Sequence, residues 1–278
     1  MSESQPVNPE STQPPEKPVE TQTDQPVEVQ AESSAAHDVE REIGRRTRRS
    51  LLVGGIASLL GAGAWEWLRT RRDDDEVQWP LRIALRANEQ VSRDYLSETR
   101  LAPTFSLADV ENPRPNGMYG LDGNPDPNWK LTVDGGGDDS TELTLADIKA
   151  LPKVEMITEF KCIEGWSRIL HWGGVRFRDF AEKYGPDDLD PNSYVSMETP
   201  DKQYYVGLDA ASAIHPQTLL AYELNGKPLA VENGAPLRLV IPLKYGIKNI
   251  KRIGRIEFTD HRPADYWAEQ GYDWYAGF

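Results

Sequence analysis

The stretch from Phe160 to Val175, FKCIEGWSRILHWGGV, contains the residues best suited to chemistry. Cys162 is the only cysteine in the chain, so it cannot form an internal disulfide. It is either an inert buried residue or a thiol kept for chemistry. A strand-like run, Val154–Phe160, ends just before it, and Trp166 and Trp172 could wall a pocket for a flat ligand. Glycines that would let a bulky ligand approach the backbone also surround the thiol: Gly165, Gly173 and Gly174.

A second candidate site is a cluster of cations further along the chain. Five of them lie within twelve residues: Lys244, Lys248, Lys251, Arg252 and Arg255. Gly246, Asn249 and Gly254 argue against a regular helix there, so we expect a turn between two strands. Lysines and exposed backbone N–H groups in such a turn suit a phosphate. The alternative is a solvated basic patch.

Charge divides the chain into three parts. Residues 1–40 hold nine acidic residues against one lysine and are rich in Pro, Glu, Gln, Ser and Thr, so we predict a disordered acidic tail. Residues 41–72 hold eight arginines against two glutamates. Residues 73–278 are strongly acidic, which argues against nonspecific nucleic-acid binding, and they are numerous enough for one domain with a sizeable core.

The arginine-rich part has the pattern of an export segment. Four arginines, Arg45, Arg46, Arg48 and Arg49, precede an apolar run from Leu51 to Leu68. The uncharged part of that run, up to Glu66, is about 15 residues, which suits a signal sequence. Thr47–Leu52, TRRSLL, resembles the bacterial twin-arginine motif, and Ala62–Ala64 resembles a cleavage site. We predict a twin-arginine-type signal or membrane anchor at 41–68, cleaved or retained, on a periplasmic protein or one on the outer face of the inner membrane.

The part beyond the signal is predicted to be a single α+β domain, 69–278, that is rich in strands. We expect strands at 129–133, 154–160, 194–197, 204–208, 219–224, 237–243 and 253–259, and helices within 79–104 and at 145–151, 177–184 and 210–214. Thr144 with Asp147 predicts a helix start, and Asn225-Gly226 predicts a hairpin. Residues 105–128 are expected to form an irregular loop, and the aromatic tail 266–278 to cover the core. Neither a P-loop string nor GxGxxG is present, so an ordinary nucleotide-binding fold is not indicated.

Two strings together are specific for one family. KCIEGWS, residues 161–167, and ENGAPLRLVIPLKYGIKNIKRI, residues 232–253, resemble the sulfite-oxidase-fold molybdenum enzymes. Within that superfamily the chain resembles most the catalytic subunit of bacterial periplasmic methionine sulfoxide reductase, over roughly residues 80 to 265. The resemblance implies a strand-rich molybdopterin-binding fold and a cofactor of one molybdenum on a single molybdopterin.

The resemblance also implies roles for single residues. Cys162 matches the catalytic, metal-ligating cysteine, and a soft thiolate suits such a metal. The cofactor-binding positions of the family correspond here to Asn88, Cys162, Thr199, Asn233, Arg238, Asn249, Ile250 and Lys251, the last three as the phosphate loop. At Asn88 this sequence departs from the family, because the Tyr-Glu pair expected three residues on is Val91-Ser92. His215 fits a family pattern too, although it could equally be a structural histidine at a helix end.

The function implied is oxygen-atom transfer by an exported, monomeric molybdenum oxidoreductase that reduces a sulfoxide such as methionine sulfoxide in proteins. Electrons would come from a membrane haem partner, because the chain has no CxxCH haem motif. One alternative is a sulfite-type oxidase or dehydrogenase, although the chain ends soon after the catalytic fold. The other, of a different class, is a membrane-tethered binding module that keeps the fold without the metal.

Overall fold

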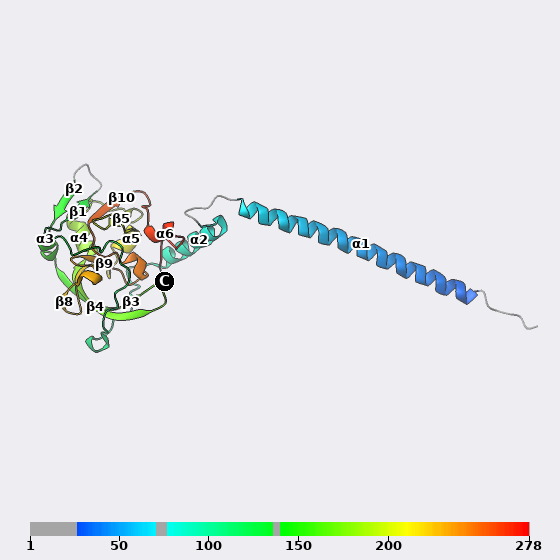
Figure 1. Ribbon diagram of the computed structural model, residues 1–278, viewed down its shortest axis with the longest axis horizontal. Helices are drawn as coiled ribbons and strands as arrows, with labels where there is room; N and C mark the ends of the chain where they lie inside the picture. Colours follow the sequence, from blue (N-terminus) through cyan, green and yellow to red (C-terminus); the bar gives the residue numbers. More distant parts are fainter. Residues whose placement is uncertain (1–26, 71–76, 136–139, 278) are drawn as a thin grey trace, which may run out of the picture. The chain divides into compact units, whose positions relative to one another are not determined.

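The computed structural model of the protein describes residues 27–70, 77–135 and 140–277. The chain divides into two compact units, Met1–Trp67 and Leu68–Phe278, which are described separately. Helix α1, Val27–Arg69, makes up the described part of the first unit, and its segment His37–Arg69 is long and apolar enough to cross a membrane (Figure 1).

The beginning of α1 differs from the prediction for the acidic tail. Residues 1–26 of that tail lie outside the described residues, whereas residues 27–40 are helical rather than disordered. The prolines of the tail stop at Pro26, and half of the following fourteen residues are Glu, Gln or Ala. These residues favour a helix, and the absence of proline removes the obstacle to one.

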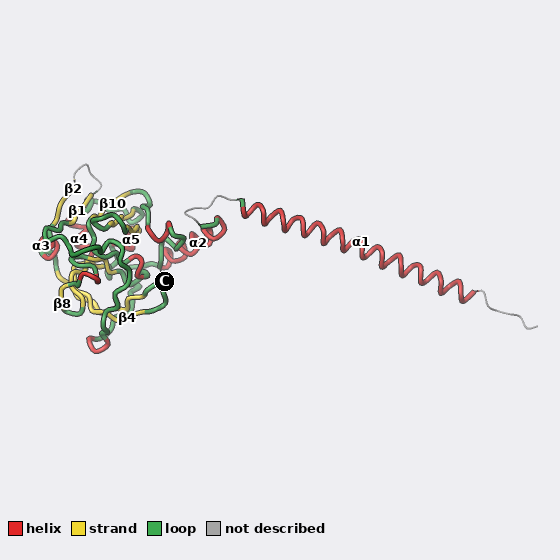
Figure 2. The backbone as a smooth tube through the Cα atoms, in the orientation of Figure 1, coloured by secondary structure: helices red, strands yellow, loops and turns green. Residues whose placement is uncertain are grey.

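The second unit contains two five-stranded sheets (Figures 1 and 2). The first has the order β2-β1-β10-β5-β6, with β1 and β10 parallel. The second has the order β3-β4-β7-β8, and β9 also pairs with β7. The strands are β1 Leu131–Asp134, β2 Ser140–Leu143, β3 Lys153–Lys161, β4 Ser167–Arg176, β5 Tyr194–Glu198, β6 Tyr205–Asp209, β7 Leu219–Leu224, β8 Lys227–Pro228, β9 Arg238–Val240 and β10 Arg255–Thr259.

Helices and short 3-10 turns connect these strands. The helices of the second unit are α2 Trp79–Tyr95, α3 Leu145–Lys149, α4 Phe177–Tyr184, α5 Ala210–Ala213 and α6 Tyr266–Glu269. The 3-10 turns are η1 Leu107–Asp109, η2 Val231–Asn233 and η3 Gly246–Lys248. The prediction of a strand-rich α+β fold is confirmed.

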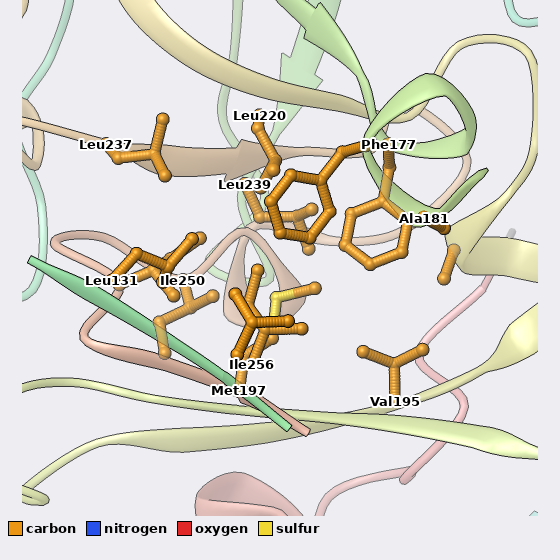
Figure 3. Close-up of a cluster of buried hydrophobic side chains, with 14 of the residues drawn as sticks. Leu131, Phe177, Ala181, Val195, Met197, Leu220, Leu237, Leu239, Ile250 and Ile256 are labelled. Carbon is orange, nitrogen blue, oxygen red and sulfur yellow. The ribbon is translucent and has the colours of Figure 1, made fainter. Parts of the chain in front are cut away.

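The main hydrophobic core takes side chains from both sheets (Figure 3). Met197 and Ile256 come from the first sheet, Leu220 and Leu239 from the second, and Phe177 from α4. Successive residues of a strand point to opposite faces of its sheet. In β7, Leu220 therefore belongs to this core, whereas its neighbours Leu219 and Ala221 belong to a second apolar cluster with Trp172. The second sheet is thus buried on both faces, and the cluster around Trp172 supports the site described below.

Several local predictions are confirmed. Helix α4 covers 177–184, as its apolar spacing predicted, and β7 and β8 form the hairpin. Asn225 and Gly226 have φ values of 51° and 72°, which suit the tight hairpin turn that Asn-Gly favours. The aromatic tail packs onto the unit, with Trp274 and Tyr275 buried.

The glycines after Cys162 do not have the role that the sequence suggested for all three. Strand β4, which was not predicted, begins at Ser167 and contains Gly173 and Gly174 at a bulge against β7. A Cβ atom on Gly174 would lie 2.2 Å from the carbonyl oxygen of Leu220. These two glycines therefore allow close pairing of strands, and only Gly165, with φ at 87°, shapes the turn at the thiol.

The start of α3 provides a test of local stability. Thr144 Oγ1 accepts a hydrogen bond from the Asp147 amide at 3.3 Å, and Asp147 Oδ2 accepts one from the Thr144 amide at 2.8 Å. We expect Thr144→Ala to lower the free energy of unfolding by about 1 kcal/mol, because it leaves a helix N–H without its cap. Urea unfolding measures this, with Thr141→Ala on exposed β2 as control; equal losses in both variants would contradict the role of the cap.

Candidate active site

A cavity of about 330 Å³ lies beside Cys162. Its walls come from the loop 113–119, the turn between β3 and β4, β4 itself, and the segment 246–251. Five predicted site residues line it, although they are distant in the sequence: Cys162, Asn233, Arg238, Asn249 and Lys251. Trp166 and Trp172 also line it, as the sequence suggested. Much of the remaining wall is aromatic or apolar, and Arg114, Asn116 and Glu164 add polar groups. The aromatic and apolar part includes Tyr119, Phe160, Ile163, Trp267 and Tyr272.

A tight turn presents the Cys162 thiol to this cavity. The Cys162 amide donates to the carbonyl of Trp166 at 2.9 Å, and the Cys162 carbonyl accepts from the Gly165 amide at 3.1 Å. The residue is 8% exposed, so the thiol is shielded from bulk water but borders the cavity. Glu164 is held in the same turn by the indole N–H of Trp166 at 3.1 Å, and this bond lowers the pKa of the Glu164 carboxyl.

Asn116 is a site residue that the sequence analysis missed. Its Nδ2 lies 3.6 Å from Cys162 Sγ, in position to donate a hydrogen bond to the sulfur. Asn116 is 46 residues before Cys162, inside the segment 105–128 that was predicted only as an irregular loop. The sequence pattern does not reveal this contact, because the contact depends on how the loop folds over the end of β3.

Arg238 is a buried cation that borders the cavity without a carboxylate partner among the described residues. It is 3% exposed. Its guanidinium donates to the carbonyls of Asn233, at 3.0 Å, and Asn249, at 3.2 Å. The Arg238 Cζ atom also lies 4.9 Å from the ring centroid of Trp172. Desolvation by burial lowers the pKa of Arg238 to about 10, so the group keeps its charge at neutral pH. A buried charge compensated only by dipoles and a ring face suits an anionic ligand.

Lys251 supplies a second cation to the same cavity. Its Nζ donates to the carbonyls of Asn116 at 2.7 Å, Gly117 at 3.2 Å and Glu232 at 2.8 Å. It therefore ties the loop that carries Asn116 to the segment that carries Arg238. Burial, with a smaller contribution from the positive charge of Arg238, lowers the pKa of Lys251 to about 7.

Three of the other four cations of the predicted basic turn have structural roles, and the fourth, Arg255, is partly exposed and paired with Asp134. Lys248 is fully buried, with Nζ at 2.5 Å from Asp265 Oδ2, and Lys244 is buried beside Asp209 at 3.5 Å. Arg252 donates to the carbonyls of two residues of the loop, Asp122 and Gly123, at 3.0 Å each. The turn is therefore not a solvated basic patch, and only Lys251 of its five cations borders the cavity.

Three predicted cofactor residues lie outside the lining of this cavity. Thr199 is buried beside a second hollow of about 450 Å³, and its Oγ1 donates to Asp201 Oδ1 at 2.6 Å. Ile250 is fully buried in the main core, and its amide donates to the Lys248 carbonyl at 3.0 Å. Asn88 is exposed on α2. Their proposed contacts with a cofactor remain predictions.

His215 is buried just after α5, away from the cavity. Its Nδ1 accepts a hydrogen bond from the Gln217 amide at 3.2 Å. Burial lowers the pKa of its imidazole. This arrangement fits the structural alternative, a histidine that organises the end of a short helix.

Lys251 gives the cofactor-free protein an expected pH dependence. A lysine in the unfolded chain has a pKa of about 10.4, well above the value of about 7 in the folded state. Between pH 7 and 9 the unfolded state therefore binds more protons, and stability rises with pH. We expect Lys251→Met to reduce that rise in urea unfolding, whereas Lys202→Met, at an exposed lysine, should leave it unchanged. Equal slopes for wild type and Lys251→Met would contradict the low pKa.

The chain is similar to one known family and to several known proteins. The family model of the oxidoreductase molybdopterin binding domain matches residues 121–267. A putative protein-methionine-sulfoxide reductase subunit, YedZ1, from Azospira oryzae is 35% identical over 234 residues, which are 83% of this chain and 86% of that protein. The catalytic subunit MsrP of protein-methionine-sulfoxide reductase from Campylobacter jejuni is 38% identical over 151 residues, 48% of this chain and 51% of that protein. Among solved structures, the sulfane dehydrogenase SoxCD from Paracoccus pantotrophus is similar with a TM-score of 0.44 and 15% identity, covering 59% of this chain and 46% of that chain, a likeness too low to carry an argument.

Proposed function

This chain belongs to the oxidoreductase molybdopterin-binding domain family, and from that premise we propose that it is an exported molybdenum enzyme that reduces a sulfoxide. The leading substrate is methionine sulfoxide in proteins, because both relatives named above are designated as parts of protein-methionine-sulfoxide reductases. The observation that carries the proposal is a single cavity bordered by the thiol of Cys162 and by two basic side chains, the buried Arg238 and the partly exposed Lys251.

The residues at the cavity fit a molybdenum–molybdopterin cofactor. Cys162 is a soft ligand suited to the metal. Arg238 and Lys251 offer positive charge to the phosphate of a single molybdopterin, and their hydrogen bonds go to neutral carbonyls rather than to a carboxylate within the described residues. Asn233, Asn249 and Ile250 would contribute polar or backbone groups of the same segment, and Thr199 and Asn88 remain candidates for more distant contacts.

The cofactor, when bound, supplies two-electron oxygen-atom transfer. The chain's residues orient and shield that reaction. Asn116 donates toward the Cys162 sulfur and thereby holds the direction of the thiol, while Lys251 fixes the loop that carries Asn116. The net reaction takes two electrons and two protons and converts a sulfoxide into a thioether and water.

The aromatic wall of the cavity suits the apolar part of such a substrate. Trp166, Tyr272 and Ile163 are partly exposed and line the cavity, so they are accessible to an incoming side chain. Sulfur groups make favourable contacts with aromatic rings at about 5 Å. Substrate preference would then depend on these rings, whereas the reaction depends on Cys162 and the cofactor.

Location and partner follow from the N-terminal part. The arginine pairs before Leu51 and the apolar helix α1 support export by the twin-arginine route, either with α1 retained as anchor or with cleavage near Trp65. Each relative is named as a subunit, which supports a second protein that delivers electrons. We propose a membrane haem protein in that role and a monomeric catalytic chain.

The test is to purify the protein from a host that makes molybdopterin. We expect about one molybdenum per chain, one pterin after oxidation, and reduction of methionine sulfoxide by reduced dyes. Sulfite-dependent dye reduction without sulfoxide reduction would reverse the direction of the proposed reaction. Protein that carries neither molybdenum nor pterin would instead indicate a module that has kept the fold without the chemistry.

A further inference from the structure

Helix α2 buries two charged side chains and exposes most of its apolar ones, although its charged residues Arg86 and Asp94 are exposed as on other surface helices. Arg82 and Glu89 face the unit and are each 7% exposed. Ile83 and Val91 face outward and are 44% and 68% exposed. A helix on the surface of a globular protein normally buries its apolar stripe and exposes its charges.

The inner face is held firmly by its charges. Glu89 Oε2 lies 2.9 Å from Arg262, and Glu89 Oε1 lies 3.0 Å from Arg93 of the same helix. Arg82 donates to the carbonyl of Ala268, and the Arg93 guanidinium lies over the ring of Tyr275. The helix therefore docks largely through polar contacts, and most of its apolar side chains remain exposed.

The outward apolar residues share one side of the helix, which also carries the exposed polar residue Asn88. Ala84, Ala87, Val91 and Tyr95 recur every three or four positions, which places them on one side of the helix, and all four are exposed. At the C-terminal end of α2, Val91, Tyr95 and exposed Leu101 line a hollow of about 650 Å³. We call Ala84, Ala87, Val91 and Tyr95 the outer stripe.

We propose that the outer stripe lies in the lipid surface of the membrane that α1 crosses. Only nine residues, 70–78, separate α1 from α2, and fully extended they span about 30 Å. A retained α1 therefore keeps the start of α2 within about 30 Å of the end of α1, so α2 can reach the membrane surface. Trp79 and Tyr95, near the two ends of α2, are 39% and 65% exposed, and such aromatic residues favour the boundary between lipid and water.

This placement would orient the catalytic unit on the membrane as well as tether it. The inference depends on α1 lying in the membrane and not on the chemistry at Cys162, so sulfoxide reduction could fail or succeed independently of it. The ligand class is phospholipid, recognised through apolar burial without a requirement for a particular headgroup.

The experiment uses the full chain with a protease site introduced between α1 and α2, inserted into phosphatidylcholine vesicles. After cleavage, we expect the catalytic unit to stay with the vesicles on sedimentation. In the double variant Ala87→Glu, Val91→Glu, the ratio of vesicle-bound to free protein should fall by about tenfold or more. In Ala87→Leu this ratio should rise. Because these positions are exposed, thermal unfolding should be unchanged in the variants.

A matched control adds two charges elsewhere. Ser140→Glu with Gln203→Glu, both exposed and remote in sequence from α2, should stay bound like the wild type. Release of the wild-type unit from vesicles would overturn the proposal, as would retention of the Ala87→Glu, Val91→Glu variant. If the unit stayed on native membranes but not on lipid vesicles, the outer stripe would bind a membrane protein rather than lipid. That result would also overturn the proposal.

Discussion

Replacement of Cys162 by serine should abolish sulfoxide reduction, with a loss of about a thousandfold or more. In the proposed site a thiolate would be the soft ligand of the metal, whereas a serine hydroxyl is hard and stays protonated at neutral pH. The change removes no large group from the turn formed with Trp166, so the fold should survive. The measurements are reduction of methionine sulfoxide with a dye donor and molybdenum content per chain.

Ser167→Ala is the matched control for that substitution. Ser167 begins β4 in the same turn and donates to Glu159 Oε1 at 2.6 Å, but it does not line the cavity. Its variant should keep most of the activity. If Cys162→Ser also reduced methionine sulfoxide at a rate near that of the wild type, the thiol could not be the metal ligand, and the proposed site would be wrong.

Replacement of Asp265 by alanine should destabilise the catalytic unit by about 3–5 kcal/mol, because it leaves the charge of Lys248 buried without its partner. Both side chains are almost fully buried, 2.5 Å apart, and Lys248 Nζ also donates to the Gly207 carbonyl at 2.9 Å. Asp265 Oδ1 in addition accepts from the Ala268 amide at the start of α6. Urea unfolding measures the loss.

An effect on the cofactor should accompany this loss of stability. Lys248 ends η3, whose Gly246 and Ile247 line the cavity, so we expect Asp265→Ala to lower molybdenum content as well. Lys153→Met is the control, since Lys153 forms its ion pairs with Glu155 and Glu223 at the surface, where solvent screens such pairs and they add little stability. A similar small loss in Asp265→Ala would show that Lys248 finds another partner or gives up its proton.

Features set by neighbouring residues could be predicted from the sequence. The capping pair Thr144 and Asp147 and the hairpin turn Asn225-Gly226 depend on a few consecutive residues, and the structure contains both. Helix α4 follows from its apolar spacing in the same way. The motif around Cys162 indicated the family, and the family match confirms it.

The arrangement of side chains around the cavity could not be predicted in this way. Nothing in the spacing of Asn116 and Cys162 requires them to meet; the path of the loop 113–119 decides it. The different roles of the lysines could not be predicted either, because nothing in the sequence distinguishes one lysine charge from another. Lys248 lies opposite Asp265 and becomes structural, whereas Lys251 meets only carbonyls and borders the cavity.

Helix α2 also combines a feature that the sequence predicted with one that only tertiary contacts decide. The sequence predicted only a short helix within 79–104, where the structure has Trp79–Tyr95, and hydrophobic spacing alone would have turned its apolar side inward. The partners of Arg82 and Glu89, at Ala268 and Arg262, lie more than 170 residues later in the chain and decide which side is buried. The sequence by itself determined the capped start of α3, helix α4, the Asn225-Gly226 turn and the family motif around Cys162, because these depend on a few consecutive residues. Only the tertiary structure decided which charges are paired and which face the cavity, because that depends on contacts between distant segments.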